Sequence, residues 1–203
     1  RSSTHHSCDS KNKPISSQYI INMPGAYHSD FNNVSVPQVC GCSLLPIKTK
    51  VKGPAAQAKA DEEDIIDEVL KYFKSNVLFR TYEVKGPADR VLLYLTFYVH
   101  LCLLRIERKK ITSKTEADKM LFTLAQEPAT LAAPGESGFI LGGYCPAPQN
   151  NQEKDTWLNY MKQAREELGY RLTPLIFDGS SDGPSKYWMQ FTRRKFLNKA
   201  FEN

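Results

Sequence analysis

The chain has 203 residues, of which 41% are hydrophobic and 24% are charged. This composition is typical of a globular protein with a buried core and excludes disorder along the whole chain. The formal net charge of +5 is mild. It does not single out nucleic acid as a partner, because nucleic-acid-binding proteins concentrate far more positive charge on one face.

The cysteines indicate a reducing compartment. There are five of them at irregular spacing, which is not the pattern of a disulfide framework. Cys40 and Cys42 are separated by one residue, and no second cysteine pair follows that would complete a zinc tetrahedron. A metal site would have to recruit His5, His6 or Cys8. We expect thiols of a flexible segment instead, and no metal.

The N-terminal part of the chain has little that can form regular structure. Residues 1–22 are rich in Ser, Asn, Lys and His and lack the apolar stretch of a signal peptide. We expect them to be a disordered extension or a non-native upstream segment, followed by a single helical subunit domain over residues 23–203. Residues 24–60 are expected to be irregular, because prolines and glycines interrupt every periodic pattern. Residues 44–47 are the one apolar anchor in this segment.

The first helix is predicted over residues 61–79. Acidic residues open it, where the N-terminus of a helix carries partial positive charge. Apolar side chains then recur at steps of four, three and four, which is the spacing of a single helical stripe. They are Ile66, Leu70, Phe73 and Val77.

A second helix is expected to begin at Pro87, because proline favours the first helical position. Residues 91–104 are apolar or aromatic on all sides except at Thr96 and His100. Fourteen residues at ~1.5 Å each span roughly 21 Å, whereas a bilayer requires ~20 residues. We therefore predict a central helix enclosed by the others. His100 is interpreted as a core or boundary histidine, not as a catalytic base.

Two further helices are predicted. Ser113 and Glu116 fit a capping box at the start of a helix over residues 114–126. The spacing of Trp157, Met161, Ala164 and Leu168 indicates another helix, with Gly169 as its C-terminal cap. Residues 139–141, in the connection between these helices, are a candidate short strand. The predicted fold is all-α: a single domain of about five helices, with residues 91–104 as the central hydrophobic helix and a long irregular N-terminal segment.

The C-terminal stretch, residues 185–201, mixes aromatic and basic side chains. On a helical wheel they do not separate into an apolar face and a charged face. Two interpretations stay open: a helix that packs partly on its own core and partly on a partner, or a solvated basic helix with scattered aromatic residues. The candidate partner-binding residues are Lys186, Tyr187, Trp188, Phe191, Arg193, Arg194 and Lys195.

No catalytic or cofactor motif is complete. Residues 135–138 follow a nucleophile elbow only in part, because the second glycine comes one residue too early. Pro184 stands where a phosphate-binding loop requires glycine. Four histidines, two of them in residues 1–22, leave little for acid–base catalysis near neutral pH. We expect no enzyme activity, no catalytic residues and no cofactor.

Short motifs spread along the chain carry a family resemblance. They include Met-Pro-Gly-Ala-Tyr-His-Ser at 23–29, Leu-Leu-Pro-Ile at 44–47, Tyr-Phe-Lys-Ser-Asn at 72–76, Pro-Gly-Glu-Ser-Gly-Phe at 134–139 and Pro-Ser-Lys-Tyr-Trp at 184–188. In this order and spacing they resemble subunit 3 of the actin-related protein 2/3 complex, the assembly that nucleates branched actin filaments. No single motif is decisive, but their collinearity from residue 23 to about residue 199 is specific.

The resemblance implies an all-helical subunit with one enclosed helix and no catalysis of its own. It implies partners: the other subunits of the complex, especially the actin-related protein 3 subunit, and an actin filament through the complex. ATP would belong to the actin-related subunits. The implied location is the cytoplasm and the cytoskeleton, in the actin-rich cortex and projections. Tyr187 stands where the family commonly has tryptophan, and residues 32–43 depart from the usual pattern, which leaves the N-terminal contacts open.

The alternative function is a nucleic-acid-binding module that uses a basic, aromatic C-terminal helix. It predicts base stacking and a steep salt dependence of binding. The chain offers no recognised binding motif and only a modest net charge. A membrane-surface helix is disfavoured because the wheel shows no clean apolar face. We expect neither nucleic acid nor a membrane as a partner.

Overall fold

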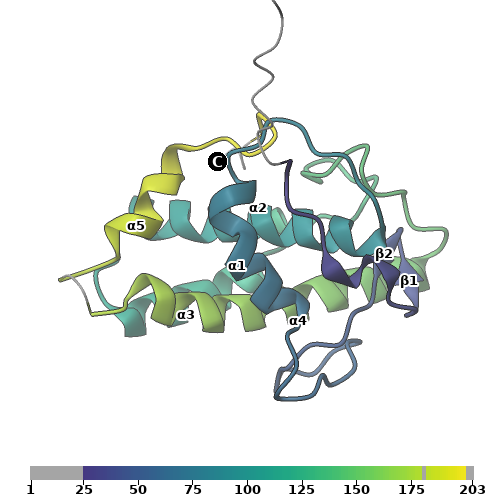
Figure 1. Ribbon diagram of the computed structural model, residues 1–203. Helices are drawn as coiled ribbons and strands as arrows, with labels where there is room; N and C mark the ends of the chain where they lie inside the picture. The colour runs from purple at the N-terminus through teal and green to yellow at the C-terminus, as the bar shows by residue number, and fades with distance from the viewer. Residues whose placement is uncertain (1–24, 180–181, 200–203) are drawn as a thin grey trace, which may run out of the picture.

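The computed structural model describes residues 25–179 and 182–199 (Figure 1). The expectations for residues 1–22, including His5, His6 and Cys8, lie outside the described residues. The helices are α1 (Ile65–Asn76), α2 (Pro87–Arg108), α3 (Lys114–Ala125), α4 (Asn151–Ile176) and α5 (Lys186–Met189), with short 3-10 turns at Asp30–Asn33, Pro128–Thr130 and Gln190–Arg193. Strands β1 (Gln38–Val39) and β2 (Cys42–Ser43) form a small antiparallel hairpin. The predicted all-α class is confirmed.

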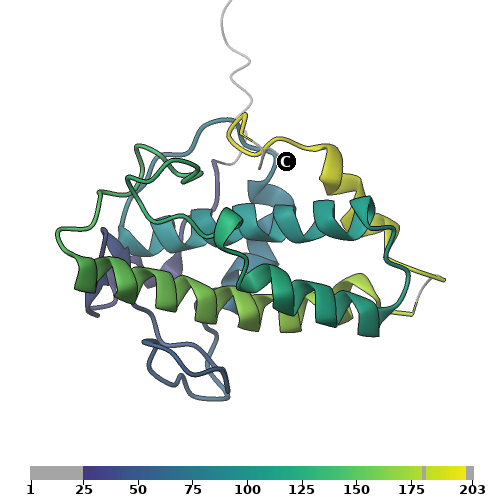
Figure 2. The same ribbon diagram turned by 180° about the vertical axis from the view of Figure 1, so that it is seen from behind.

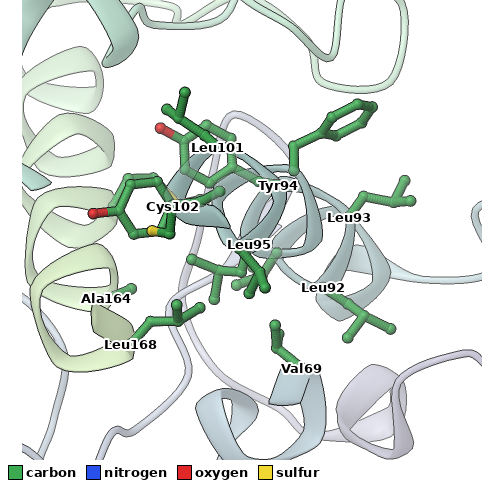
Figure 3. Close-up of a cluster of buried hydrophobic side chains, with 14 of the residues drawn as sticks. Val69, Leu92, Leu93, Tyr94, Leu95, Leu101, Cys102, Ala164 and Leu168 are labelled. Atoms are coloured by element: carbon green, nitrogen blue, oxygen red, sulfur yellow. The ribbon is translucent and has the colours of Figure 1, made fainter. Parts of the chain in front are cut away.

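Helix α2 occupies the centre of the molecule. It runs alongside α4, α1 crosses the pair on one face, and α3 packs against α4 on the other (Figures 1 and 2). Figure 3 shows Val69 of α1 and Leu168 of α4 directed toward the side chains of α2. Residues 91–103 are all buried, as expected for a helix that others enclose.

The length of α2 corrects one part of the sequence argument. The expected apolar run was too short for a bilayer, but polar residues extend the helix at both ends to 22 residues. By length and composition alone it is long enough to cross a membrane, and 83% of its apolar window is buried inside the protein. Burial by α1, α3 and α4, and not shortness, identifies α2 as a core helix.

Helix α1 begins four residues later than predicted, because Asp64 caps it. Its Oδ1 accepts hydrogen bonds from the backbone N–H groups of Ile66 (3.0 Å) and Asp67 (3.1 Å). The Asp67 carboxylate accepts in return from the N–H of Asp64 at 3.1 Å, which completes a capping box. Arg171 of α4 contacts both carboxylates at 2.9 Å and so fixes α1 against α4.

Helix α4 passes through the position where it was expected to end. The prediction of Gly169 as a C-terminal cap is wrong, since the helix continues to Ile176. A Cβ atom at Gly169 would lie 3.3 Å from the Cβ of Leu121, so this glycine permits the close approach of α3 to α4. Ser113 accepts from the N–H of Glu116 at 3.3 Å and starts α3 where predicted. Residues 140 and 141 lie in a turn and Phe139 has no regular structure, so the candidate strand at 139–141 is wrong.

Candidate functional site

The C-terminal segment is not one continuous helix. The four-residue α5 passes into a 3-10 turn over Gln190–Arg193, and Arg194 is extended. The expected helix over this stretch is therefore wrong in extent. The break has a physical reason: it lets Phe196 turn back onto Phe97 of α2, with the ring centroids 4.7 Å apart.

Two of the candidate partner-binding aromatics are committed to the core of the protein itself. Trp188 and Phe191 both pack on Phe73 of α1, at centroid distances of 5.8 Å and 5.7 Å. Both are buried, and the Lys74 ammonium lies 4.5 Å from the centre of the Trp188 ring. These rings attach the segment to α1. They are unavailable for the base stacking that the nucleic-acid alternative requires.

The other candidate residues face solvent. Tyr187 is 72% exposed, and the four cations of this segment are also exposed: Lys186 in α5, Arg193 at the end of the following turn, and Arg194 and Lys195 just after it. These elements lie at one end of the molecule, in yellow in Figure 1. One short segment thus carries one large exposed ring and four exposed cations, on a backbone that the buried rings hold in place. We call these five residues the C-terminal surface.

Polar contacts to α2 hold the same segment. The carbonyl of Thr192 accepts from His100 Nε2 at 3.3 Å, and the hydroxyl of Thr192 lies 3.0 Å from a carboxylate oxygen of Glu107. Burial lowers the pKa of His100, and the carbonyl contacts offset this only in part. His100 is accordingly a neutral core histidine, as interpreted from the sequence.

A buried carboxylate that the sequence argument missed holds the start of the described chain. The Asp89 side chain at the first turn of α2 is fully buried. It accepts hydrogen bonds from the backbone N–H groups of Ser29 (2.8 Å) and Lys85 (2.9 Å) and from the side chains of His28 and Asn32 (both 2.8 Å). Burial alone would raise the pKa of Asp89, but these donors outweigh it and hold the pKa below its ordinary value.

A second carboxylate, Glu68 of α1, accepts from the hydroxyl of Ser29 at 2.6 Å and from the N–H of Asp30 at 2.7 Å. Here burial prevails over those two donors, so the pKa of Glu68 is raised. Together the two carboxylates attach residues 28–32 to α1 and α2. A signal existed in the sequence, since Asp89 is an acidic residue just before a long apolar run, but three of its four partners lie about sixty residues away.

A groove of about 860 Å³ lies between the loop at residues 48–51 and helices α3 and α4. Its walls include the exposed rings of Phe122 and Tyr170 together with the acidic side chains of Asp118 and Glu166. Within the described residues, no group of three or more His, Cys, Asp or Glu side chains is arranged to hold a metal ion. The groove is thus an open surface with aromatic rings and mixed charge.

These features define a small all-helical protein that is built around one enclosed helix and has a basic surface at its C-terminal end. Residues 23–201 match the family described as P21-Arc, the ARP2/3 complex ARPC3 (21 kDa) subunit, and the chain belongs to this family. The resemblance seen in the sequence motifs is confirmed.

Relatives from distant organisms support the assignment over nearly their whole length. A Dictyostelium discoideum protein named actin-related protein 2/3 complex subunit 3 is 46% identical over 176 residues, which is 86% of this chain and 98% of the relative. An Arabidopsis thaliana protein of the same name is 39% identical over 173 residues, covering 85% of this chain and 97% of its own. A Caenorhabditis elegans protein, named as a probable subunit 3, is 44% identical over 178 residues.

Proposed function

We propose that the chain is a non-catalytic structural subunit of an actin-related protein 2/3 complex. In this proposal it packs against the actin-related protein 3 subunit and supports nucleation of branched actin filaments from the side of an existing filament. The other subunits of the complex are its partners, and it works in the cytoplasm at the actin-rich cortex and projections. The observation that carries the proposal is the family match over residues 23–201.

The architecture suits a structural role. Residues 23–203 would act as one helical domain in which the N-terminal segment is held by two buried carboxylates and the C-terminal segment by buried rings. A subunit that positions its neighbours benefits from such fixed ends, because little conformational entropy remains to be lost on assembly.

The C-terminal surface is our candidate for a partner contact. Tyrosine and arginine are enriched at energetically important positions of protein interfaces. Tyr187 is exposed next to the buried Trp188, which fixes the backbone that carries it, and the four cations can steer the chain toward acidic partner surfaces. Trp188 and Phe191 contribute indirectly, by holding the surface in place.

Reversing the charge of Arg193, Arg194 and Lys195 to glutamate is expected to weaken association with the rest of the complex about tenfold, mainly by slowing association. The measurement is the association rate of the variant with the remaining subunits at two salt concentrations, together with the branching rate of actin filaments. Unchanged assembly and branching would end the proposal for this surface.

A matched control reverses three exposed lysines on another part of the molecule. Lys50, Lys52 and Lys59 lie in the loop between β2 and α1, at the bottom of Figure 1 and away from α5. This variant has the same change in net charge, so a difference between the two variants reports on the position of the charges and not on their sum.

The assignment itself is tested by affinity purification of the tagged chain from its own cells, followed by mass spectrometry. We expect two actin-related proteins and several small subunits in near-equal amounts. A chain recovered alone, or with nucleic acid, would overturn the proposed function.

A further inference from the structure

Two cysteines that are far apart in sequence meet near the β-hairpin. The sulfur of Cys42 on β2 lies 3.8 Å from the sulfur of Cys145, which is 103 residues further along in the connection between α3 and α4. Cys42 is fully buried, whereas Cys145 is partly exposed. Cys145 is therefore the member of the pair nearer to solvent, and Cys42 is enclosed by the protein.

We propose that Cys42 and Cys145 are a thiol-oxidation site, at which a peroxide converts the pair to a reversible disulfide that joins the hairpin to the α3–α4 connection. Cytosolic disulfides in most organisms are transient and serve redox sensing or catalysis, and not permanent structure. The inference does not depend on the proposed function, because it requires no partner subunit.

Arg90 lies where it can support a thiolate. Its Nε donates to the carbonyl of Tyr144 at 2.7 Å, and its Nη1 donates to the carbonyl of Gly41 at 3.1 Å. These are the residues immediately before Cys145 and Cys42. The guanidinium thus connects the two backbone segments that carry the sulfurs and brings positive charge to them.

The chemistry of the two thiols is unequal. A hydrogen bond from the Cys42 thiol lowers the pKa of Cys145, burial works against this, and the Arg90 charge lowers it further; the net pKa is below the ordinary value. The pKa of Cys42 is raised, first by that same hydrogen bond and then by burial. The thiolate is the nucleophile in such reactions, so Cys145 reacts first and Cys42 resolves the product.

The reaction balances in two steps. The Cys145 thiolate attacks one oxygen of hydrogen peroxide, so that an S–O bond forms, the O–O bond breaks, and the released hydroxide takes a proton to become water. Cys42 then attacks the sulfur of the Cys145 sulfenic acid. The S–S bond forms, the S–O bond breaks, and the leaving hydroxide takes the proton of the Cys42 thiol, giving a second water.

The other described cysteines are poorer candidates. Burial, with the nearby Glu153 carboxylate, raises the pKa of Cys40 to about 12, and burial raises that of Cys102 on α2 to about 12. Both thiols therefore stay protonated at neutral pH. Closing the pair requires the two sulfurs to approach from 3.8 Å to about 2.05 Å. A two-residue strand and an irregular connection carry them, so no long helix has to shift.

The test treats the full chain with hydrogen peroxide, blocks the remaining thiols with iodoacetamide, and analyses the peptides without reduction. We expect a cross-link between the peptides that contain Cys42 and Cys145, a chain lighter by two hydrogen masses before blocking, and a higher melting temperature. Dithiothreitol should reverse all three changes. Absence of the cross-link in the unmutated chain, with Cys145 oxidised to sulfinic acid, would overturn the proposal.

Variants are needed to show which cysteine is cross-linked to Cys145. Trypsin leaves Cys40 and Cys42 in one peptide, because no Lys or Arg lies between them. Cys145→Ser and Cys42→Ser should each abolish the cross-link, whereas Cys40→Ser and the control Cys102→Ser should retain it. A cross-link that survives in Cys42→Ser but is lost in Cys40→Ser would assign the chemistry to Cys40 and refute the pair proposed here. Circular dichroism checks that each variant is folded.

Discussion

Arg165→Ala is expected to lower the free energy of unfolding by about 3–5 kcal/mol. The guanidinium is fully buried on α4. Nη1 donates to the carbonyl of Thr130 (2.9 Å) and contacts the Tyr94 hydroxyl (3.3 Å), while Nη2 donates to the carbonyl of Leu124 (2.6 Å) and to the Thr130 hydroxyl (2.8 Å). The group also lies 4.4 Å from the centre of the Tyr98 ring.

The size of the effect follows from what alanine would leave behind. Leu124 is in the last turn of α3, where its carbonyl accepts from the backbone N–H of Glu127 at 3.2 Å as well as from Arg165. A cation there also interacts favourably with the negative end of the helix dipole. Alanine removes these donors, leaves buried carbonyl oxygens without them, and opens a cavity.

Urea denaturation followed by circular dichroism measures the effect. Arg165→Lys keeps the charge but offers one nitrogen in place of the two terminal guanidinium nitrogens that donate here, so it should still cost about 2 kcal/mol. The control Lys119→Ala, at an exposed position of α3, should change the stability by no more than about 0.5 kcal/mol. A loss below about 1 kcal/mol in Arg165→Ala would show that the buried contacts contribute little.

Asp89→Ala is expected to lower the free energy of unfolding by about 3 kcal/mol and to release residues 28–32 from α1 and α2. Four donors converge on this carboxylate, and each loses its acceptor in the variant. Amide hydrogen exchange at Ser29 and Lys85 measures the release directly. Asp30→Ala, which removes an exposed carboxylate from the same segment, is the control and should leave exchange at both amides unchanged.

Asp89 should also contribute to the pH dependence of stability. Its pKa is lower in the folded than in the unfolded chain, where an aspartate titrates at about 3.9. The unfolded state therefore binds more protons between the two values, and stability falls as the pH drops through that window. The raised pKa of Glu68 acts above this window and in the opposite sense. We expect the stability difference between the natural chain and Asp89→Asn to shrink below pH ~4, in urea titrations between pH 3 and 7. A constant difference would mean that the Asp89 charge is unimportant.

Periodic apolar spacing predicted α1 and α4 because each buries one stripe, a run that is apolar on all sides predicted α2, and a capping box marked the start of α3. The same spacing does not reveal what a glycine does. Gly169 looks like a helix end in the sequence, and only the approach of Leu121, about fifty residues earlier, shows that it is a contact point between two helices. The local sequence around a glycine does not show which distant residue packs against it.

The sequence identified the aromatic and basic residues of the candidate site, but it did not show which of them are buried and which are exposed. Aromatic rings that scatter around a helical wheel are explained once the rings have two destinations, Phe73 for Trp188 and Phe97 for Phe196. The break in the helix allows both ring contacts to form at once, whereas a continuous helix does not. The same break determines which of the basic side chains are exposed.

The burial of α2 also sets conditions on how the chain is synthesised. A ribosome adds about 5–20 residues per second, and α2 ends at Arg108 whereas the covering helix α4 begins only at Asn151. For some seconds the nascent chain therefore carries a 22-residue helix with a long apolar middle, similar in composition to a membrane anchor, and the part of its cover that α4 supplies has not yet been translated. The fold described here therefore requires that this helix stays out of a membrane until α3 and α4 have been translated and can pack on it.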